Sequence, residues 1–329
     1  MQNEPIVRLP PELSQRASLS SRVPTGQGRL TLQRRMLGFG ILAFLLVVGF
    51  ASPLAGLARF AFHSDLYSHI LLIPFISLYL IWVSRQSLAP DEKLGWMGMA
   101  GPLFAGFAIL LIYKLAALGG WQPEKEDYLA FMTAEFLCLL LAGMLLFLGR
   151  GFVRRYLFAL ALLLFTIPFP AILCEWIEVF FQHGSTETSY GFLWASGVPI
   201  LREGFVFHMP GSSIQVAREC SGIHSSLVLF ITSLLAGHLF LRRASSRWLL
   251  TLAVIPLALL RNGLRIFVIA QLCVQIDPSM IHSFIHKRGG PIFFALSLIP
   301  FFLLILFLRR REAHSESRRK EINQLESVI

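Results

Sequence analysis

The sequence predicts an all-α, multi-pass transmembrane bundle of about eight spans, with a small extracytoplasmic β-hairpin before the sixth span. Hydrophobic residues make up 55% of the 329 residues and charged residues only 15%, far less charge than a soluble protein carries. Mean hydropathy is +0.65. Several apolar runs reach the length of about 20 residues that a membrane-spanning helix needs. An integral membrane domain is therefore expected over residues 36–308.

The apolar runs define the expected helices in order along the chain. The fifth run contains TIPFP, so this helix is expected to kink or end at Pro168 and Pro170, because proline lacks the N–H that a helix interior uses. The following stretch, AILCEWIEVFFQ, fits a helix that lies along the membrane interface. The expected helices lie near residues 36–58, 67–84, 95–119, 128–149, 156–181, 220–241, 248–273 and 291–308.

The positions of the basic residues predict the orientation. With a cytoplasmic N-terminus, 20 of the 29 Lys and Arg residues fall in cytoplasmic segments and six in outer segments, as the positive-inside rule requires. Residues 1–35 are expected to form a disordered basic cytoplasmic tail and residues 309–329 a second basic cytoplasmic tail. The net charge of +10 therefore reflects topology, and no nucleic-acid partner is expected.

The longest outer segment is expected from about residue 182 to residue 219, before the sixth helix. In EGFVFHMPGSSIQVA, large apolar residues occupy every second position up to a Pro-Gly pair, and apolar residues alternate again on the return. Alternation on both sides of a turn signal predicts a β-hairpin. The alternating residues are Phe205, Phe207, Met209, Ile214 and Val216.

Cys220, in VARECSGIHSS, stands where this outer segment enters the sixth helix. Unpaired N–H groups and the positive end of the helix dipole favour a thiolate there, so Cys220 is a candidate nucleophile. The alternative is that it is a small apolar packing residue, which is the interpretation of Cys138, Cys174 and Cys273. The cysteines are too few and too scattered to indicate a disulfide framework.

Arg265, in LALLRNGLRIFVIA, lies inside the seventh expected helix. An arginine within a span is costly and marks a functional candidate, and its long side chain can reach toward the outer interface. Arg261 lies one turn deeper on the same face. The alternative for both is a structural ion pair, with Glu135 or Glu219 as the acid.

His286, in IHKRGGPIFF, lies in the last outer loop and is a candidate proton carrier. His224, four residues after Cys220, and His208, in the hairpin, remain alternatives. The charge-derived topology puts Cys220, Arg265 and His286 in one layer at the outer face. A thiolate, a cation and an imidazole are the groups that acyl transfer through a thioester requires.

At these residues the sequence resembles the exosortase/archaeosortase family of membrane transpeptidases. VARECSGIHSS is similar to the cysteine motif of that family, RNGLRI to its N-x-x-R-I motif, and HKRGGPIFF to its histidine motif. The similarity with specific motifs extends from about Leu193 to Phe294. Upstream of Leu193 it consists of hydropathy and span number only.

The resemblance implies Cys220 as nucleophile, Arg265 as catalytic arginine and His286 as third member, with Arg261 accessory. The substrate would be an exported protein whose C-terminal sorting signal combines a short motif, one spanning helix and a basic end. Cleavage would occur at the outer face of the inner membrane, among its lipids, and the acyl group would pass to an amine or to water. No metal or organic cofactor is expected. The residues expected to contact the substrate are Arg202, Arg218, Arg261, Ser221 and Gly222.

Other functions compete with the transpeptidase interpretation. The charged residues within expected spans would suit a transporter, although neither an inverted repeat nor a set of broken helices is visible. A non-catalytic scaffold for exopolysaccharide assembly, with a structural cysteine, is a second alternative, and an acyltransferase with a lipid donor is a third. Only the enzyme interpretations require Cys220 to react.

Overall fold

The structure, a computed structural model, describes residues 26–84, 96–210, 212–218, 222–277 and 289–326. The chain forms two compact units. The first contains the residues up to Ser64 and Ser68–Phe169, and the second contains Asp65–Tyr67 and the chain from Pro170 onward. In the described residues both units are helical, and the second also holds one small sheet, so the predicted fold class is confirmed.

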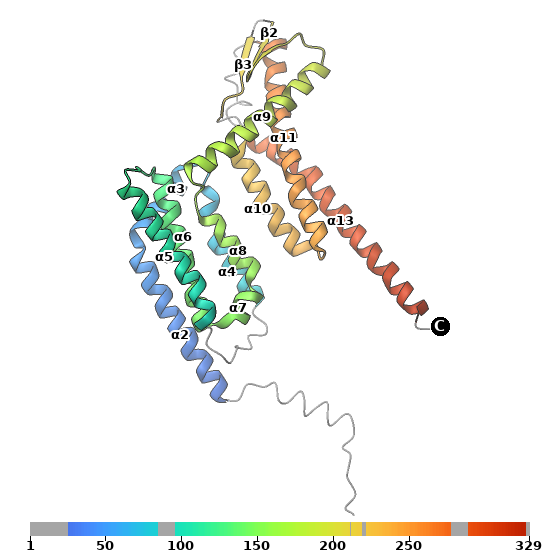
Figure 1. Cartoon of the computed structure of the whole chain (residues 1–329). Helices are drawn as coiled ribbons and strands as arrows, with labels where there is room; N and C mark the ends of the chain where they lie inside the picture. Colours follow the sequence, from blue (N-terminus) through green and yellow to red (C-terminus); the bar gives the residue numbers. More distant parts are fainter. Residues whose placement is uncertain (1–25, 85–95, 211, 219–221, 278–288, 327–329) are drawn as a thin grey trace, which may run out of the picture. The chain divides into compact units, whose positions relative to one another are not determined.

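The first unit is built from helices only in its described part. Figure 1 shows α2, α5 and α6 side by side, and α6 packs against both of the others. The first turn of α6 carries a capping box, in which Glu124 and Asp127 each accept the other's backbone N–H. The elements are α2 (Gly26–Gly49), α3 (Ala51–His63), η1 (Ser68–Leu71), α4 (Ile73–Val83), α5 (Trp96–Leu118), α6 (Lys125–Phe147), α7 (Gly149–Arg155), α8 (Leu157–Leu162) and η2 (Leu163–Thr166).

The second unit contains four long helices and the sheet. These helices are α9 (Ala171–Ala195), α10 (Ile223–Phe240), α11 (Ala244–Gln275) and α13 (Gly290–Glu326). Helix α11 packs against all three others, so it forms the centre of the unit. The candidate residue Arg265 lies on this central helix.

Five of the described helices are long and apolar enough to cross a membrane, namely α5, α6, α10, α11 and α13. Two pairs of helices separated by short breaks pass the same test together, which gives up to seven spans. One of these pairs is α2 with α3, bent by 70°. The expected second span corresponds to the shorter apolar helix Ser68–Val83. The count of about eight spans is reached only if this segment also crosses, and at 1.5 Å per residue it is about 24 Å long.

The prolines of the fifth expected helix interrupt it as predicted. Helix η2 ends at Thr166, Pro170 occupies the N-cap position of the next helix, and α9 begins at Ala171. Helix α9 then continues to Ala195. Residues 182–195 are therefore helical, whereas the sequence predicted that the outer segment begins at about residue 182.

The predicted hairpin is confirmed, and one more strand joins it. Strands β2 (Val206–Met209) and β3 (Ser212–Gln215) pair antiparallel, with Phe207 opposite Ile214. The added strand is β1 (Leu201–Glu203), which pairs with β2. Strand β1 was not predicted from the sequence, because a run of three residues is too short to show an alternating pattern.

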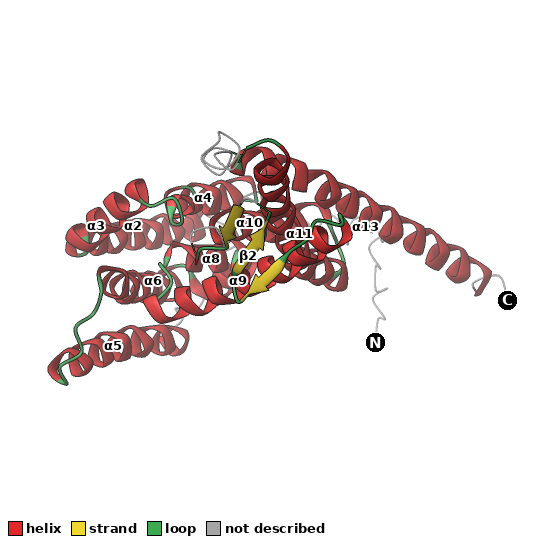
Figure 2. Cartoon of the chain, turned by 90° about the horizontal axis from the view of Figure 1, so that it is seen from above, coloured by secondary structure: helices red, strands yellow, loops and turns green. Residues whose placement is uncertain are grey.

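One face of the sheet packs onto the helices of the second unit. Figure 2 shows the strands beside α9 and α11. Phe207 is fully buried and Val216 nearly so, and both belong to a cluster that includes Leu193 of α9 and Ile269 of α11. Cys273 is buried in the same cluster, as expected for a packing cysteine. The alternating residues thus anchor the segment that leads to Cys220.

Both expected tails are partly helical. Helix α2 begins at Gly26, ten residues before the expected start of the first span, and α13 continues past residue 308 to Glu326. At its basic end α13 is held by Glu312, whose carboxylate accepts the N–H groups of Arg242 and Arg243 at 2.9 and 3.0 Å. This carboxylate therefore caps the start of α11.

Candidate active site

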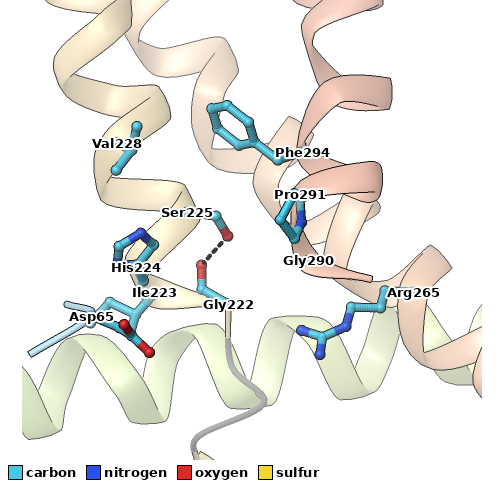
Figure 3. Close-up of a pocket in the computed structure, with 10 residues that line it drawn as sticks. All are labelled: Asp65, Gly222, Ile223, His224, Ser225, Val228, Arg265, Gly290, Pro291 and Phe294. Carbon is cyan, nitrogen blue, oxygen red and sulfur yellow. Dashed lines mark hydrogen bonds between the residues drawn. The ribbon is translucent and has the colours of Figure 1, made fainter. Parts of the chain in front are cut away.

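A pocket in the second unit brings together the chain segments next to the candidate residues. Its volume is about 520 Å³, which is sufficient for a peptide segment. Its described walls come from the residues before η1, the start of α10, the middle of α11 and the start of α13 (Figure 3). The lining residues are Asp65, Gly222, Ile223, His224, Ser225, Val228, Arg265, Gly290, Pro291 and Phe294.

Gly222 fixes the start of α10 at the pocket wall. Its φ of +75° lies in the left-handed region, which favours glycine. A Cβ atom there would lie 3.0 Å from the side-chain Oδ1 of Asn262 and 3.3 Å from Nη2 of Arg261. The Gly222 carbonyl accepts hydrogen bonds from the hydroxyls of Ser225 and Ser226, at 3.1 and 2.8 Å. The residue is therefore restricted to glycine by both conformation and space.

Arg261 joins α11 to the start of α10. Its side chain is buried, and Nη2 donates to the carbonyl of Gly222 at 3.3 Å and to the hydroxyl of Ser226 at 3.2 Å. Nη1 is also buried and has no hydrogen-bond partner among the described residues. Arg261 does not line the described pocket wall, so its contacts here are those of a positioning residue.

Asn262 and Gly263 fix α11 against α9. Nδ2 of Asn262 donates to the hydroxyl of Ser185 at 2.8 Å, with both residues buried. A Cβ atom on Gly263 would lie 2.7 Å from Cβ of Thr188, so the two helices cross too closely for any side chain there. Small residues at such a crossing let helix backbones approach within the membrane.

Arg265 points its guanidinium into the pocket (Figure 3). It lies one turn after Arg261, so both arginines emerge on the same side of α11. Arg265 is the one lysine or arginine among the described lining residues. The residues of the segment RNGLR therefore have two different roles. Its first three residues fix the position of the helix, and its last presents a cation to the pocket.

Two further polar residues line the pocket. His224, in the first turn of α10, was one of the alternative partners, and its Nδ1 is buried without a hydrogen-bond partner in the described part of the chain. Asp65 was not predicted as a site residue, because an acidic residue in a short loop is usually just solvated. The available signal was its position in an outer loop of the charge-derived topology, the side on which Arg265 and Cys220 were expected.

Arg202 and Arg218 lie outside the described pocket wall, and each is paired with a glutamate. Arg202 forms a two-pronged ion pair with Glu187 at 2.6 and 3.0 Å, and this hydrogen bonding raises the pKa of Arg202. Arg218 donates to Glu175 at 3.0 Å. The alternative histidine His208 bonds Ser213 at 2.9 Å and lies in β2. Substrate contacts by the two arginines remain a prediction.

Cys220, Ser221 and His286 lie outside the described residues, as does Glu219. In the sequence, Gly222 follows Cys220 by two residues, and Gly290 follows His286 by four. Both glycines line the pocket together with Arg265. The pocket is thus the place in the described structure to which all three candidate segments lead.

Fold and pocket together define a helical integral membrane protein, in which a buried polar framework presents an arginine to a pocket at the start of a helix. The family model described as Transmembrane exosortase (Exosortase_EpsH) matches residues 61–303, which contain all of the segments that line the pocket. The chain belongs to the transmembrane exosortase family. Neither a curated protein nor a solved structure matches it.

Proposed function

We propose that the protein is an integral membrane cysteine peptidase and transpeptidase that cleaves C-terminal sorting signals of exported proteins. Cys220 is the nucleophile, Arg265 stabilises the oxyanion, and His286 moves the proton. The active site faces the outer side of the inner membrane and both termini lie in the cytoplasm, as the distribution of basic residues favours. Membership of the exosortase family supports this reaction class.

The observation that carries the proposal is the framework around Arg265. A buried arginine, a buried asparagine and a glycine fix one turn of α11 against α9 and α10, and the next turn presents Arg265 to a pocket. A cation kept in place before the reaction begins stabilises a developing oxyanion without the cost of reorganisation. A solvated surface arginine would not require this support.

In the proposed reaction, the Cys220 thiolate attacks the carbonyl carbon of the peptide bond just outside the membrane. The oxyanion of the tetrahedral intermediate forms beside Arg265, and the C–N bond breaks as His286 protonates the leaving amine. The upstream part of the substrate remains on the sulfur as a thioester. An amine or water then attacks the thioester, and the thiolate is released.

The walls of the pocket suit a peptide that emerges from a membrane. Val228, Pro291 and Phe294 provide apolar surface on α10 and α13, and Arg265 provides the charge (Figure 3). An acidic residue in the sorting motif would gain from outer cations. At Arg202 and Arg218 it would have to compete with Glu187 and Glu175, which already bind these side chains.

Co-expression with a candidate sorting-signal protein tests the proposal. We expect uncut precursor to accumulate with Cys220→Ala and with Cys220→Ser, since neither side chain replaces a thiolate. Arg265→Ala is expected to lower the cleavage rate by about 100-fold or more, the usual loss when one oxyanion donor is removed. His286→Ala should be similarly impaired, because general acid catalysis contributes about 100-fold or more. Precursor and product are separated by gel mobility.

Cys138→Ala is the matched control, because Cys138 packs against Gly106 in the first unit, and it should process like the wild type. A transporter or a scaffold would tolerate Cys220→Ala. Normal processing of the substrate by that variant would therefore refute the proposal that Cys220 is the catalytic nucleophile. In the wild type, a membrane-impermeant thiol reagent applied from outside should react first with Cys220.

A further inference from the structure

The pocket carries opposite charges on two sides. In Figure 3, Asp65 and His224 lie to one side of the Gly222 end of α10, and the Arg265 guanidinium lies to the other side. Both charged residues line the same volume of about 520 Å³. A pocket that only had to stabilise an oxyanion would gain nothing from a carboxylate, because a nearby anion opposes a developing negative charge. A carboxylate on the other side of the same pocket instead suits a positively charged second substrate, because it attracts a cation.

His224 adds a proton acceptor on the carboxylate side. Imidazole gains and loses a proton near neutral pH, which makes it the usual general base. Its Nδ1 is buried and has no hydrogen-bond partner among the described residues. A buried nitrogen without a partner in the protein is uncommon, and it is available to a ligand or to a water molecule. The ring lines the pocket one residue after Ile223, the first residue of α10.

We propose that Asp65 and His224 form the acceptor side of the pocket, where a primary amine is bound as an ammonium ion and deprotonated. This inference rests on the proposed thioester mechanism, and it gives the second substrate a chemical class and a binding site. Asp65 attracts the ammonium group. His224 removes the proton that would prevent the nitrogen from acting as a nucleophile.

The chemistry balances without a further reactant. His224 takes one proton from the ammonium ion, and the neutral nitrogen forms a C–N bond to the thioester carbonyl carbon. The resulting oxyanion lies on the side of Arg265. Collapse of the intermediate breaks the C–S bond, and the second nitrogen proton passes to the departing sulfur of Cys220. The products are an amide and the free enzyme thiol.

The arrangement favours an amine over water as acceptor. Water needs a general base but has no positive charge for Asp65 to attract, whereas an amine at neutral pH arrives as a cation. A carboxylate at the pocket raises the local concentration of such a cation and holds it in hydrogen-bond reach. Loss of the carboxylate should therefore weaken aminolysis of the thioester more than its hydrolysis.

A competition between two acceptors tests the inference with the full-length protein in membrane vesicles. The sorting-signal substrate is offered together with methylamine, which is an ammonium ion at neutral pH, or with hydroxylamine, which is largely uncharged. Mass spectrometry measures the ratio of methylamide or hydroxamate to free acid. In Asp65→Asn we expect the methylamide ratio to fall about tenfold, the effect of losing one charge-assisted hydrogen bond, and the hydroxamate ratio to change less than about twofold.

His224→Asn should lower the methylamide ratio at least as much, because the bound ammonium ion then lacks its base. Glu203→Gln and His63→Gln are the controls, since both side chains are exposed and neither lines the pocket. Their product ratios should match the wild type. If Asp65→Asn abolishes all cleavage, Asp65→Glu provides the readout, and it should retain the preference for methylamine over hydroxylamine.

An unchanged methylamide ratio in Asp65→Asn would overturn the inference, and so would an equal fall in both ratios. Loss of the methylamine preference in Asp65→Glu would do the same. Failure of the proposed function gives a different result, because the wild-type protein would then release no cleaved product with either acceptor. The two failures are therefore distinguishable in one experiment.

Discussion

Single glycines differ in what they tolerate, and Gly222 at the pocket and Gly197 after α9 show the difference. Gly222 and Gly197 both have a φ of +75°, so any L-residue is strained at either position. Around Gly197 there is open space, whereas a Cβ on Gly222 would press on Asn262 and Arg261. The same substitution at the two positions therefore separates conformational strain from crowding at the candidate site.

Gly222→Ala is expected to reduce substrate cleavage strongly, and Gly197→Ala only weakly. Left-handed conformation costs about 1–2 kcal/mol for a residue with a Cβ atom, and both variants bear this cost in thermal unfolding. Only Gly222→Ala must also displace the side chains that position α11 and the start of α10. Cleavage rate and unfolding temperature are measured for both variants. Equal loss of cleavage in the two would contradict the positioning role of Gly222.

The sequence predicted the arginine of the pocket but not the aspartate, and the reason is the environment of each residue. An arginine inside an apolar run is energetically costly, so Arg265 stands out without any structural knowledge. Asp65 occupies a loop, where a charged residue costs nothing, and only the tertiary fold shows that it lines the pocket. Arg261 stood out for the same reason as Arg265, although its contacts are with Gly222 and Ser226.

Helix α9 is the element that hydropathy describes least well. Its second half, from Gln182 to Ala195, is polar enough to resemble an outer loop, yet Ser185, Thr186 and Ser189 are fully buried. The hydroxyls of Thr186 and Ser189 donate to backbone carbonyls one turn earlier, and the Ser185 hydroxyl accepts from Asn262, so burial costs little. The apolar spans, the proline break and the alternating strands could be predicted because each has a local pattern. The packing of a small-residue helix face has none.

At the crossing of α9 and α11, Gly263→Ala should destabilise the protein and slow cleavage. The added methyl group would lie 2.7 Å from Cβ of Thr188, and overpacking of this kind costs about 1–3 kcal/mol. Gly191→Ala on α9 is the control, because a Cβ there meets nothing within 4 Å. It should leave the protein as stable as the wild type or slightly more stable, since alanine favours a helix over glycine by about 1 kcal/mol.

The double variant Gly263→Ala with Thr188→Gly checks the cause. Removal of the Thr188 side chain makes room for the new methyl group, so the double variant should be more stable than the sum of its single changes implies. The unfolding temperature of all variants is measured in detergent. Strict additivity would show that the two positions do not press on each other.

At the scale of the whole molecule, the pocket agrees with the topology derived from charge. The positive-inside rule assigns three segments to the same outer side. Two of them contain Asp65 and Gly290, and the third ends just before Gly222. All three residues line one pocket with Arg265. The opposite end of α11, where basic residues gather, is built differently. There Arg242 pairs with Glu316 at 3.2 Å, and Glu312 caps the start of α11. Lys and Arg residues near such an end disfavour its transfer across the membrane.

Single cysteines introduced at the two ends should report this orientation. In a Cys220→Ala background, His63→Cys and Ser317→Cys add a thiol at exposed positions expected on opposite sides of the membrane. We expect a membrane-impermeant maleimide to label the cysteine at position 63 in intact cells with a permeable outer envelope. The cysteine at position 317 should react only after the inner membrane is opened. Labelling of both positions in intact cells, or of position 317 alone, would mean that the basic residues do not set the topology, and the candidate site would then face the cytoplasm or lack a defined side.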